Sequence, residues 1–388
     1  MNKKFYLVLI SGVIVLFLSI GALLARTNTK DSSYTYLSIF SNVVHLVDAN
    51  YVEEVDFNKV MDSALVGMVE NLDPDSFYIK AAEIDEYRKD LEDDKNKAGV
   101  GLTLVKRQGM VIVAAVEKGS SAEQNKMKPG DYIRTIENQY VQPLPLYKVY
   151  HLLRGNPGTD VKISIFRSAM EKPEEFTLAR RMVTKPYTES YVVQPHIGYI
   201  RIGHLLPGVE TEVENKLNSF NSQNATKLIL DLRGCTEDDQ ATAVKVADLF
   251  VGEVPIVQIS GRDGMIKKIT GDPKIAYKGE VLLLVDFTTL GGAEVIAGAL
   301  QDAGVAKTFG TRTFGRGGIQ KLIPAGPNWV VLTTQKYLTP KGKMILTNGI
   351  EPTIAYKEDV KSVDETEDVD HMLQKAIDLL RAPVQKAA

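Results

Sequence analysis

The 388-residue sequence has few of the residues that build disulfide bonds and metal sites. It contains a single cysteine, Cys235, which excludes an internal disulfide. Five histidines are scattered along the chain with none of the spacing typical of a zinc site: His45, His151, His196, His204 and His371. We therefore expect no metal ion and no other cofactor.

An excess of positive charge is also missing. The 46 Lys and Arg residues are outnumbered by 49 Asp and Glu residues, which gives a net charge of −3. Because proteins that bind nucleic acids concentrate basic residues against the phosphates, we expect no nucleic-acid partner. The hydrophobic fraction of 44% is ordinary for globular protein, and the length predicts two or three domains.

A long stretch without charge stands near the N-terminus. Lys3 and Lys4 precede residues 5–25, which carry no charge, and Arg26 follows. A helix of this length measures about 30 Å, roughly the thickness of the hydrocarbon layer. Cleaved signal peptides usually have a shorter apolar run, so the pattern favours an uncleaved anchor. The positive-inside rule then predicts a single-pass protein of the bacterial cytoplasmic (inner) membrane, with its bulk in the periplasm.

The hydrophobic pattern divides the rest of the chain into regions. Apolar residues recur at helical spacing in residues 27–95. In residues 96–172, short alternating segments predict a small β-barrel module, with an amphipathic helix at 144–155. Residues 173–357 alternate apolar strands with helices, which is typical of a layered α/β core. Residues 358–388 add a C-terminal helix and tail.

Several segments, in this order, resemble one family of peptidases: "LDPDSFYI", "AGVGLTL", "MKPGDYIRTIEN", "LLRGNPGTDVKISIFR", "LILDLRG", "AEVIAGALQ" and "TFGRG". The family is that of the C-terminal processing peptidases (tail-specific proteases, peptidase family S41), which are membrane-associated serine proteases with an embedded PDZ domain. The resemblance covers about residues 35–380. It implies an α/β fold in which a PDZ domain occupies residues 96–172 and a ClpP/crotonase-like core occupies residues 173–357.

The segments that carry catalysis in this family differ in the present sequence. The family uses a serine on a strand-to-helix turn, a lysine as its base and a glutamine that orients the lysine. The resemblance places Gly291 at the serine, Arg316 at the lysine and Gln320 at the glutamine. Gly291 and Arg316 are 25 residues apart, which is also the family's spacing. The oxyanion loop, N-N-P-G-G in the family, is "GCTED" here, with Glu237 and Asp238 in place of the glycines.

These replacements argue against peptide hydrolysis. Glycine supplies no nucleophile, and arginine, with a pKa above about 12, cannot act as a base near neutral pH. Acidic residues bring negative charge to a loop that should stabilise an oxyanion. Thr288, Thr289 and Cys235 are the remaining candidate nucleophiles. No Lys or His is placed to activate either threonine, and the acidic neighbours of Cys235 disfavour its thiolate.

The segments that bind peptides in this family are retained. A PDZ domain adds a peptide as an extra strand and holds its C-terminal carboxylate with backbone N–H groups of a glycine-containing loop. The resemblance assigns this loop, and the helix residues of the side-chain pocket, to seven residues: Gly99, Val100, Gly101, Leu102, Val149, Leu152 and Leu153.

The sequence therefore predicts a catalytically inactive homologue of these peptidases, tethered to the membrane. We expect its partners to be protein C-termini or an active peptidase relative in the cell envelope. The oligomeric state stays open, and the chain itself forms either a monomer or a homo-oligomer. Two alternatives stay open. One is an active S41 serine-type endopeptidase that cleaves C-terminal tails with an unrecognised nucleophile. The other is a scaffold protein of the cell envelope.

Overall fold

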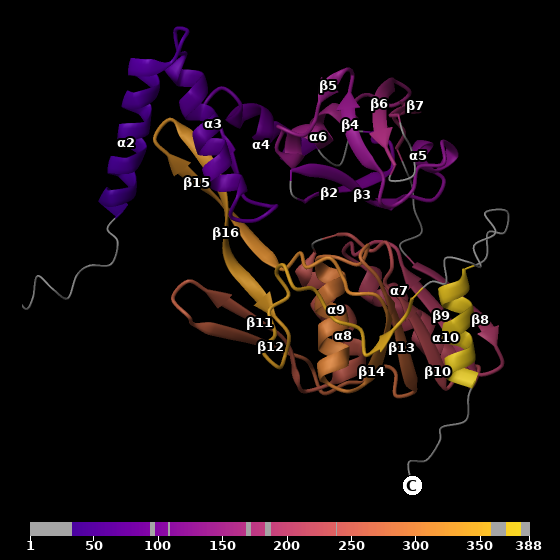
Figure 1. The fold of residues 1–388 in the computed structure, drawn as a ribbon. Helices are drawn as coiled ribbons and strands as arrows, with labels where there is room; N and C mark the ends of the chain where they lie inside the picture. Colours follow the sequence, from indigo (N-terminus) through magenta and orange to yellow (C-terminus); the bar gives the residue numbers. More distant parts are fainter. Residues whose placement is uncertain are drawn as a thin grey trace, which may run out of the picture. The chain divides into compact units, whose positions relative to one another are not determined.

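A computed structural model describes residues 33–93, 98–107, 109–167, 172–182, 188–237, 239–357 and 370–381 (Figure 1). The chain forms two compact units, of which the first ends at Leu65 and the second begins at Val66. The first unit contains helix α2 (Ser33–Asn50) and most of helix α3 (Phe57–Glu70). Both helices fall in the region where apolar residues recur at helical spacing.

The described ranges contain no helix that is long and apolar enough to cross a membrane. The longest of these helices is α2, with 18 residues, and it carries Ser, Asn, His and Asp among its apolar residues. The predicted anchor at residues 5–25 lies outside the described residues. The prediction of a single-pass membrane protein is therefore corrected, because no helix among the described residues could span a membrane, and we do not retain it.

In the second unit, the first of three sheets is antiparallel and lies between residues 102 and 179. Its strands pair in the order β2-β3-β4-β6-β7, and β5 lies beside β4. They are β2 (Leu102–Arg107), β3 (Met110–Val116), β4 (Tyr132–Ile136), β5 (Gln139–Tyr140), β6 (Asp160–Phe166) and β7 (Glu174–Ala179). Helices α5 (Ser121–Gln124) and α6 (Leu146–Leu153) complete this module, and their apolar residues share its core.

The module extends further along the chain than the predicted boundary at residue 172. Strand β7 pairs with β6 from Glu174 to Ala179, and Arg181 forms a bridge with Gly99. Glu174 and Glu175, just after this boundary, lie on an edge strand and are exposed to solvent, which explains their charge.

The second sheet forms the core and is mainly parallel. Its order is β17-β14-β13-β10-β9-β8, and only β8 runs antiparallel to its neighbour. The strands are β8 (Thr188–Gln194), β9 (Ile197–Ile202), β10 (Lys227–Asp231), β13 (Glu280–Val285), β14 (Ala306–Gly310) and β17 (Ile354–Ala355). The predicted α/β class is confirmed for this core.

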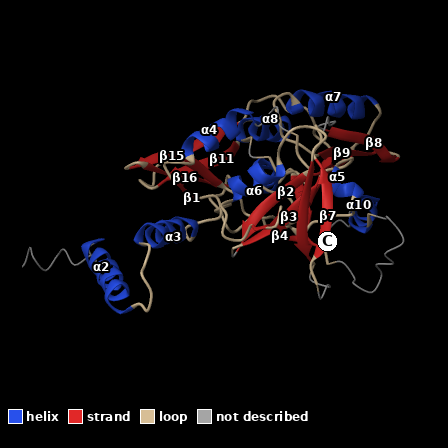
Figure 2. Ribbon diagram, turned by 90° about the horizontal axis from the view of Figure 1, so that it is seen from above, coloured by secondary structure: helices blue, strands red, loops and turns tan. Residues whose placement is uncertain are grey.

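Helices cover both faces of the core sheet. On one face lie α7 (Val209–Ser222), α8 (Gln240–Val251) and α9 (Gly292–Asp302), and on the other lies α10 (His371–Arg381). Figure 2 shows α7 and α8 on one side of β9 and α10 on the opposite side. Ile229 of β10 packs toward α10, whereas its neighbours Leu228 and Leu230 pack toward the other helices. Burial on both faces explains the unbroken apolar runs in these strands.

The third sheet is antiparallel and connects distant parts of the chain. Its order is β1-β16-β11-β12, and β15 pairs with β16 in a long hairpin (Figure 1). The strands are β1 (Phe77–Ile79), β11 (Pro255–Gly261), β12 (Ile266–Thr270), β15 (Gly318–Ala325) and β16 (Asn328–Leu338). Helix α4 (Ile84–Asp93) follows β1, so this sheet places residues 74–93 close to β15.

Candidate functional site

The turn between β13 and α9 carries Gly291 as the N-cap residue of the helix. Its backbone angles are φ 63° and ψ −124°, in a region that a residue with a Cβ atom adopts only with strain. A sharp turn of this kind, between a strand and a helix, also carries the nucleophile of many α/β hydrolases. The local geometry of a nucleophile turn is therefore present, while the residue at its tip has no hydroxyl group.

Glu294 holds this turn from within α9. Its side chain is fully buried, and Oε2 accepts hydrogen bonds from the backbone N–H groups of Gly291 at 3.2 Å and Arg316 at 2.7 Å. Oε1 accepts from the N–H of Gly315 at 2.7 Å and from the hydroxyl of Thr313. Burial raises the pKa of Glu294 to about 7, although the four donors act in the opposite direction. One carboxyl group thus ties the turn to the loop that carries Arg316.

The backbone N–H after the nucleophile position is already engaged. The N–H of Gly292 donates to the carbonyl oxygen of Glu237 at 3.1 Å. The carboxylate of Glu237 is itself held, since Oε1 makes a hydrogen bond with Nδ1 of His204 and Oε2 accepts from the N–H of Leu205 at 3.3 Å. A Cβ atom on Gly292 would come within 2.8 Å of Leu205. The loop that contains Glu237 therefore packs closely against the start of α9.

Arg316, which the sequence predicts at the position of the base, takes part in an ion pair. Its Nη2 atom lies 3.0 Å from Oδ1 of Asp75. Gln320 does not complete a catalytic arrangement, because its Nε2 donates to the hydroxyl oxygen of Thr333 at 3.1 Å. The structure therefore links Gly291 and Arg316 through Glu294 and places Gln320 with another partner. The remaining predicted residue of the loop, Asp238, lies outside the described residues.

The side chains of the three other candidate nucleophiles are buried or held by hydrogen bonds within the fold. The Thr289 hydroxyl is fully buried and donates to the carbonyl oxygen of Leu232 at 3.1 Å. The Thr288 hydroxyl donates to Oδ1 of Asp286 at 2.5 Å. Cys235 is buried in the core, and this burial raises the pKa of its thiol well above the usual value. The Thr289 hydroxyl thus bonds to a carbonyl oxygen, which is not a base, and the buried Thr288 hydroxyl lies between the carboxyl group of Asp286 and the N–H of Gly234.

Within the described ranges, no group of three or more His, Cys, Asp and Glu residues is arranged to hold a metal ion. His204 and Glu237 form a pair near the start of α9, and no third residue of this kind joins them within the described ranges.

The predicted carboxylate-binding loop precedes β2. Gly99 and Arg181 exchange two backbone hydrogen bonds, of 3.2 Å and 2.8 Å. Gly101 has a φ angle of 81°, and a Cβ atom at this position would lie 2.1 Å from Cβ of Ser120. Glycine is therefore required here by both backbone conformation and space. Leu102 begins β2 directly after this turn.

Most of the predicted side-chain contacts for a peptide belong to the core of the module. Four of the predicted residues are buried in it: Val100, Leu102, Val149 and Leu153. Leu152 is partly buried and packs against the same core. These side chains stabilise the fold of the module, and with almost no exposed surface they offer little contact to the side chains of a peptide. The sequence did not single out Tyr150, whose hydroxyl bonds to Leu104 of β2.

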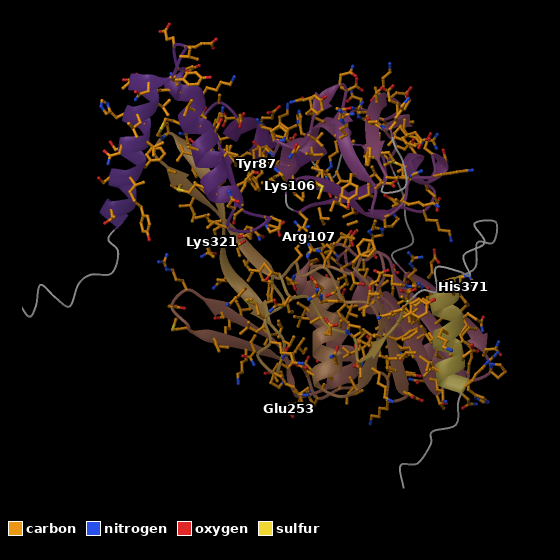
Figure 3. All side chains as sticks on the ribbon, in the orientation of Figure 1. Tyr87, Lys106, Arg107, Glu253, Lys321 and His371 are labelled. Atoms are coloured by element: carbon orange, nitrogen blue, oxygen red, sulfur yellow. The ribbon has the colours of Figure 1, made fainter. Side chains whose placement is uncertain are left out.

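A pocket of about 270 Å³ lies beside α6. Helices α4 and α6, strand β1 and the start of β15 contribute to its wall. Its lining includes Asp75, Phe77, Tyr87, Tyr150, Arg316 and Gln320. Tyr87 is labelled on α4 in Figure 3. Arg316 and Gln320, which the sequence predicts at the family's lysine and glutamine positions, thus line a pocket with several aromatic side chains.

Comparisons with known proteins bear on the family of this chain. Residues 196–356 match the family model of peptidase family S41. The chain is 28% identical over 347 residues to a carboxy-terminal-processing protease of Bartonella bacilliformis. The aligned region covers 86% of this chain and 77% of that protein. The chain is a homologue of the C-terminal processing proteases of peptidase family S41. The family predicted from the sequence is thereby confirmed.

Two further comparisons agree with this homology. The chain is 30% identical over 321 residues to the carboxy-terminal processing protease CtpB of Bacillus subtilis, with 81% of this chain and 66% of that protein covered. The solved structure of a photosystem II D1 C-terminal processing protease is similar with a TM-score of 0.69 and 23% identity, over 82% of this chain and 86% of that one. This likeness concerns the fold.

Proposed function

We propose that this S41 homologue is a pseudopeptidase, which binds the C-termini of polypeptides and does not cleave them. The observation that carries the proposal is the state of the nucleophile turn. Gly291 offers no hydroxyl, and the N–H of Gly292, which would help to stabilise an oxyanion, donates to the carbonyl oxygen of Glu237 at 3.1 Å. A substrate carbonyl oxygen could not use this N–H without displacing the Glu237 loop.

The base position supports the same proposal. Arg316 is a permanent cation, and Asp75 pairs with it at 3.0 Å. Proton abstraction needs a group that is neutral for part of the time, as a desolvated lysine is. Arg316 instead contributes to structure, because its backbone N–H and its side chain bond to two different carboxyl groups.

Peptide binding is proposed for the module that contains β2 and α6. Its glycine turn at Gly99–Gly101 precedes an edge strand, and a helix lies alongside this strand, which is the arrangement that PDZ domains use to add a peptide strand. The ligand is an extended polypeptide with a free carboxylate and an apolar end. The carboxylate would accept hydrogen bonds from the backbone of the turn, and the polypeptide would pair with β2.

Hydrolysis is tested with the full chain and fluorescein-labelled β-casein, an unfolded polypeptide. We expect no fragments from the parent chain. The double variant Gly291→Ser with Arg316→Lys should also give no measurable turnover, because the N–H of Gly292 stays engaged with Glu237. Cleavage by the parent chain that is lost in Arg316→Ala would overturn the proposal of an inactive enzyme.

Binding is tested separately, by fluorescence polarisation with a labelled decapeptide that ends in Ala-Leu-Val. We expect saturable binding of the free acid and at least about tenfold weaker binding of its C-terminally amidated twin, since the amide lacks the charge that strengthens the hydrogen bonds. Equal affinities for both peptides, or no binding of either, would contradict recognition of C-termini.

A further inference from the structure

Helix α6 reaches the edge of β2 with a single side chain. The hydroxyl of Tyr150 accepts a hydrogen bond from the N–H of Leu104 at 2.7 Å and donates one to the carbonyl oxygen of Leu104 at 3.2 Å. Among the described strands, β2 has a neighbour on one side only, namely β3. An added peptide strand would pair with the backbone groups on the other side. The hydroxyl thus occupies both backbone groups that Leu104 offers to such a strand.

Several features keep the Tyr150 ring in this position. The guanidinium group of Arg154, one helical turn further on, lies over the ring at 5.1 Å from its centroid. Burial raises the pKa of the Tyr150 phenol, so the hydroxyl stays protonated and can donate as well as accept. The ring also packs against the core of the module. These contacts hold the Tyr150 hydroxyl against the backbone of Leu104.

A pocket beside the Tyr150 ring offers a second position for it. Tyr150 also lines the pocket of about 270 Å³ beside α6, together with Phe77, Tyr87 and Arg316. This volume exceeds that of a phenol ring, and its aromatic lining suits one. A rotation of the Tyr150 side chain into the pocket would release both backbone groups of Leu104 without unfolding α6. Lys106 of β2, two residues after Leu104, is labelled in Figure 3.

We infer that Tyr150 gates the peptide site of the module. In the closed state its hydroxyl takes the place of a peptide strand at Leu104. In the open state its ring lies in the pocket, and an extended polypeptide with a free C-terminus pairs with β2. The inference rests on the proposed peptide binding and adds a competing contact within the chain. Neutral hydrogen bonds contribute modestly on balance, so a peptide that pairs with several residues of β2 can displace the hydroxyl.

The test uses the full chain and the variant Tyr150→Phe, which keeps the ring and removes the hydroxyl. Tyr140→Phe is the matched control, because Tyr140 lies on β5 of the same module with 58% of its surface exposed. The first measurement is amide hydrogen exchange at Leu104 without any peptide. We expect exchange about 5- to 20-fold faster in Tyr150→Phe than in the parent chain, and no change in the control.

The second measurement is the affinity for the decapeptide that ends in Ala-Leu-Val. We expect Tyr150→Phe to bind the free acid about 3- to 10-fold more tightly than the parent chain, and the control to bind it equally. Unchanged exchange at Leu104, or faster exchange with unchanged or weaker affinity, overturns the gate. If no chain binds the peptide, peptide binding and the gate fail together, and the exchange result still shows separately whether the contact with Leu104 exists.

Discussion

The N–H of Gly292 and the carbonyl oxygen of Glu237 form a hydrogen bond of 3.1 Å that joins the start of α9 to the loop after β10. Under the proposed function, this N–H is the group that would otherwise stabilise a substrate oxyanion. Here it serves the packing of the chain, and the Glu237 side chain adds a second attachment through His204 and Leu205. The turn thus has no hydroxyl group at Gly291, and the N–H of the next residue is engaged within the chain.

The side chain of Glu237 is expected to hold this loop in place. Glu237→Ala removes the bonds to His204 and Leu205 but keeps the carbonyl oxygen that Gly292 uses. We expect the free energy of unfolding to fall by about 1–2 kcal/mol, because the buried N–H of Leu205 loses its partner. The Gly292 amide should exchange about tenfold faster, as measured by hydrogen exchange with mass spectrometry.

The control for this variant is Glu214→Ala, which removes a carboxylate from a surface ion pair with Lys274. It should leave exchange at Gly292 unchanged, since exposed ion pairs contribute little to stability. Equal exchange at Gly292 in Glu237→Ala and the parent chain would show that the backbone contact alone holds the loop.

The backbone of Gly291 should tolerate no side chain without a cost in stability. At φ 63° and ψ −124°, Gly291→Ala or Gly291→Ser places a Cβ atom in a strained conformation, and we expect about 1–3 kcal/mol of destabilisation. Gly67→Ala is the matched control, because Gly67 lies in α3 with a helical backbone and open space around its Cα. It should be neutral or slightly stabilising. Urea unfolding followed by circular dichroism measures both, and a fully stable Gly291→Ala would contradict the strain.

The sequence predicts Gly291 and Arg316 at the positions of the family's serine and lysine, because the segments around them resemble the family's segments. It could not predict how the turn at Gly291 is closed. That closure depends on a bond between Gly292 and Glu237, which are far apart in the sequence and meet only when α9 packs beside the loop. Contacts of this kind follow from tertiary packing and leave no periodic pattern.

Two further differences have similar causes. The seven residues predicted to bind a peptide lie in the loop before β2, at the start of β2 and in α6, and their apolar side chains mostly point into the core, so spacing does not distinguish Tyr150 from them. Its bond to Leu104 spans 46 positions. The boundary at residue 172 was placed too early, because exposed acidic residues on the edge strand β7 have the composition of a linker.

Cys235 should be inert toward thiol reagents in the folded protein. It is fully buried, and burial raises the pKa of its thiol well above the usual value, so almost no reactive thiolate forms. We expect iodoacetamide at pH 8 to modify it at least about 100-fold more slowly than in the urea-unfolded chain. Ser222→Cys, at an exposed position of α7, supplies the control by adding a second thiol that reacts quickly. Rapid labelling of Cys235 would revive it as a candidate nucleophile.

The stability of the core should depend on pH through Glu294. The pKa of this carboxyl group is raised by burial from 4.5 to about 7 in the folded protein. Between these values the folded state holds a proton that the unfolded state has released. The free energy of unfolding should therefore fall as the pH rises from about 4.5 to about 7, by up to about 3 kcal/mol from this group, and level off above pH 7.

Glu294→Gln isolates this contribution. The amide cannot titrate, so the fall in stability between pH 4.5 and pH 7 should be smaller than in the parent chain. In Glu294→Gln an NH2 group replaces one carboxyl oxygen, and it cannot accept hydrogen bonds. Either the pair of bonds from Gly291 and Arg316 or the pair from Gly315 and Thr313 is then lost. The variant should therefore be less stable at every pH, by about 2–4 kcal/mol at pH 7. Glu253→Gln, at the exposed residue labelled in Figure 3, should keep the parent's pH dependence. An identical pH profile for Glu294→Gln and the parent chain would show that Glu294 stays charged across this range.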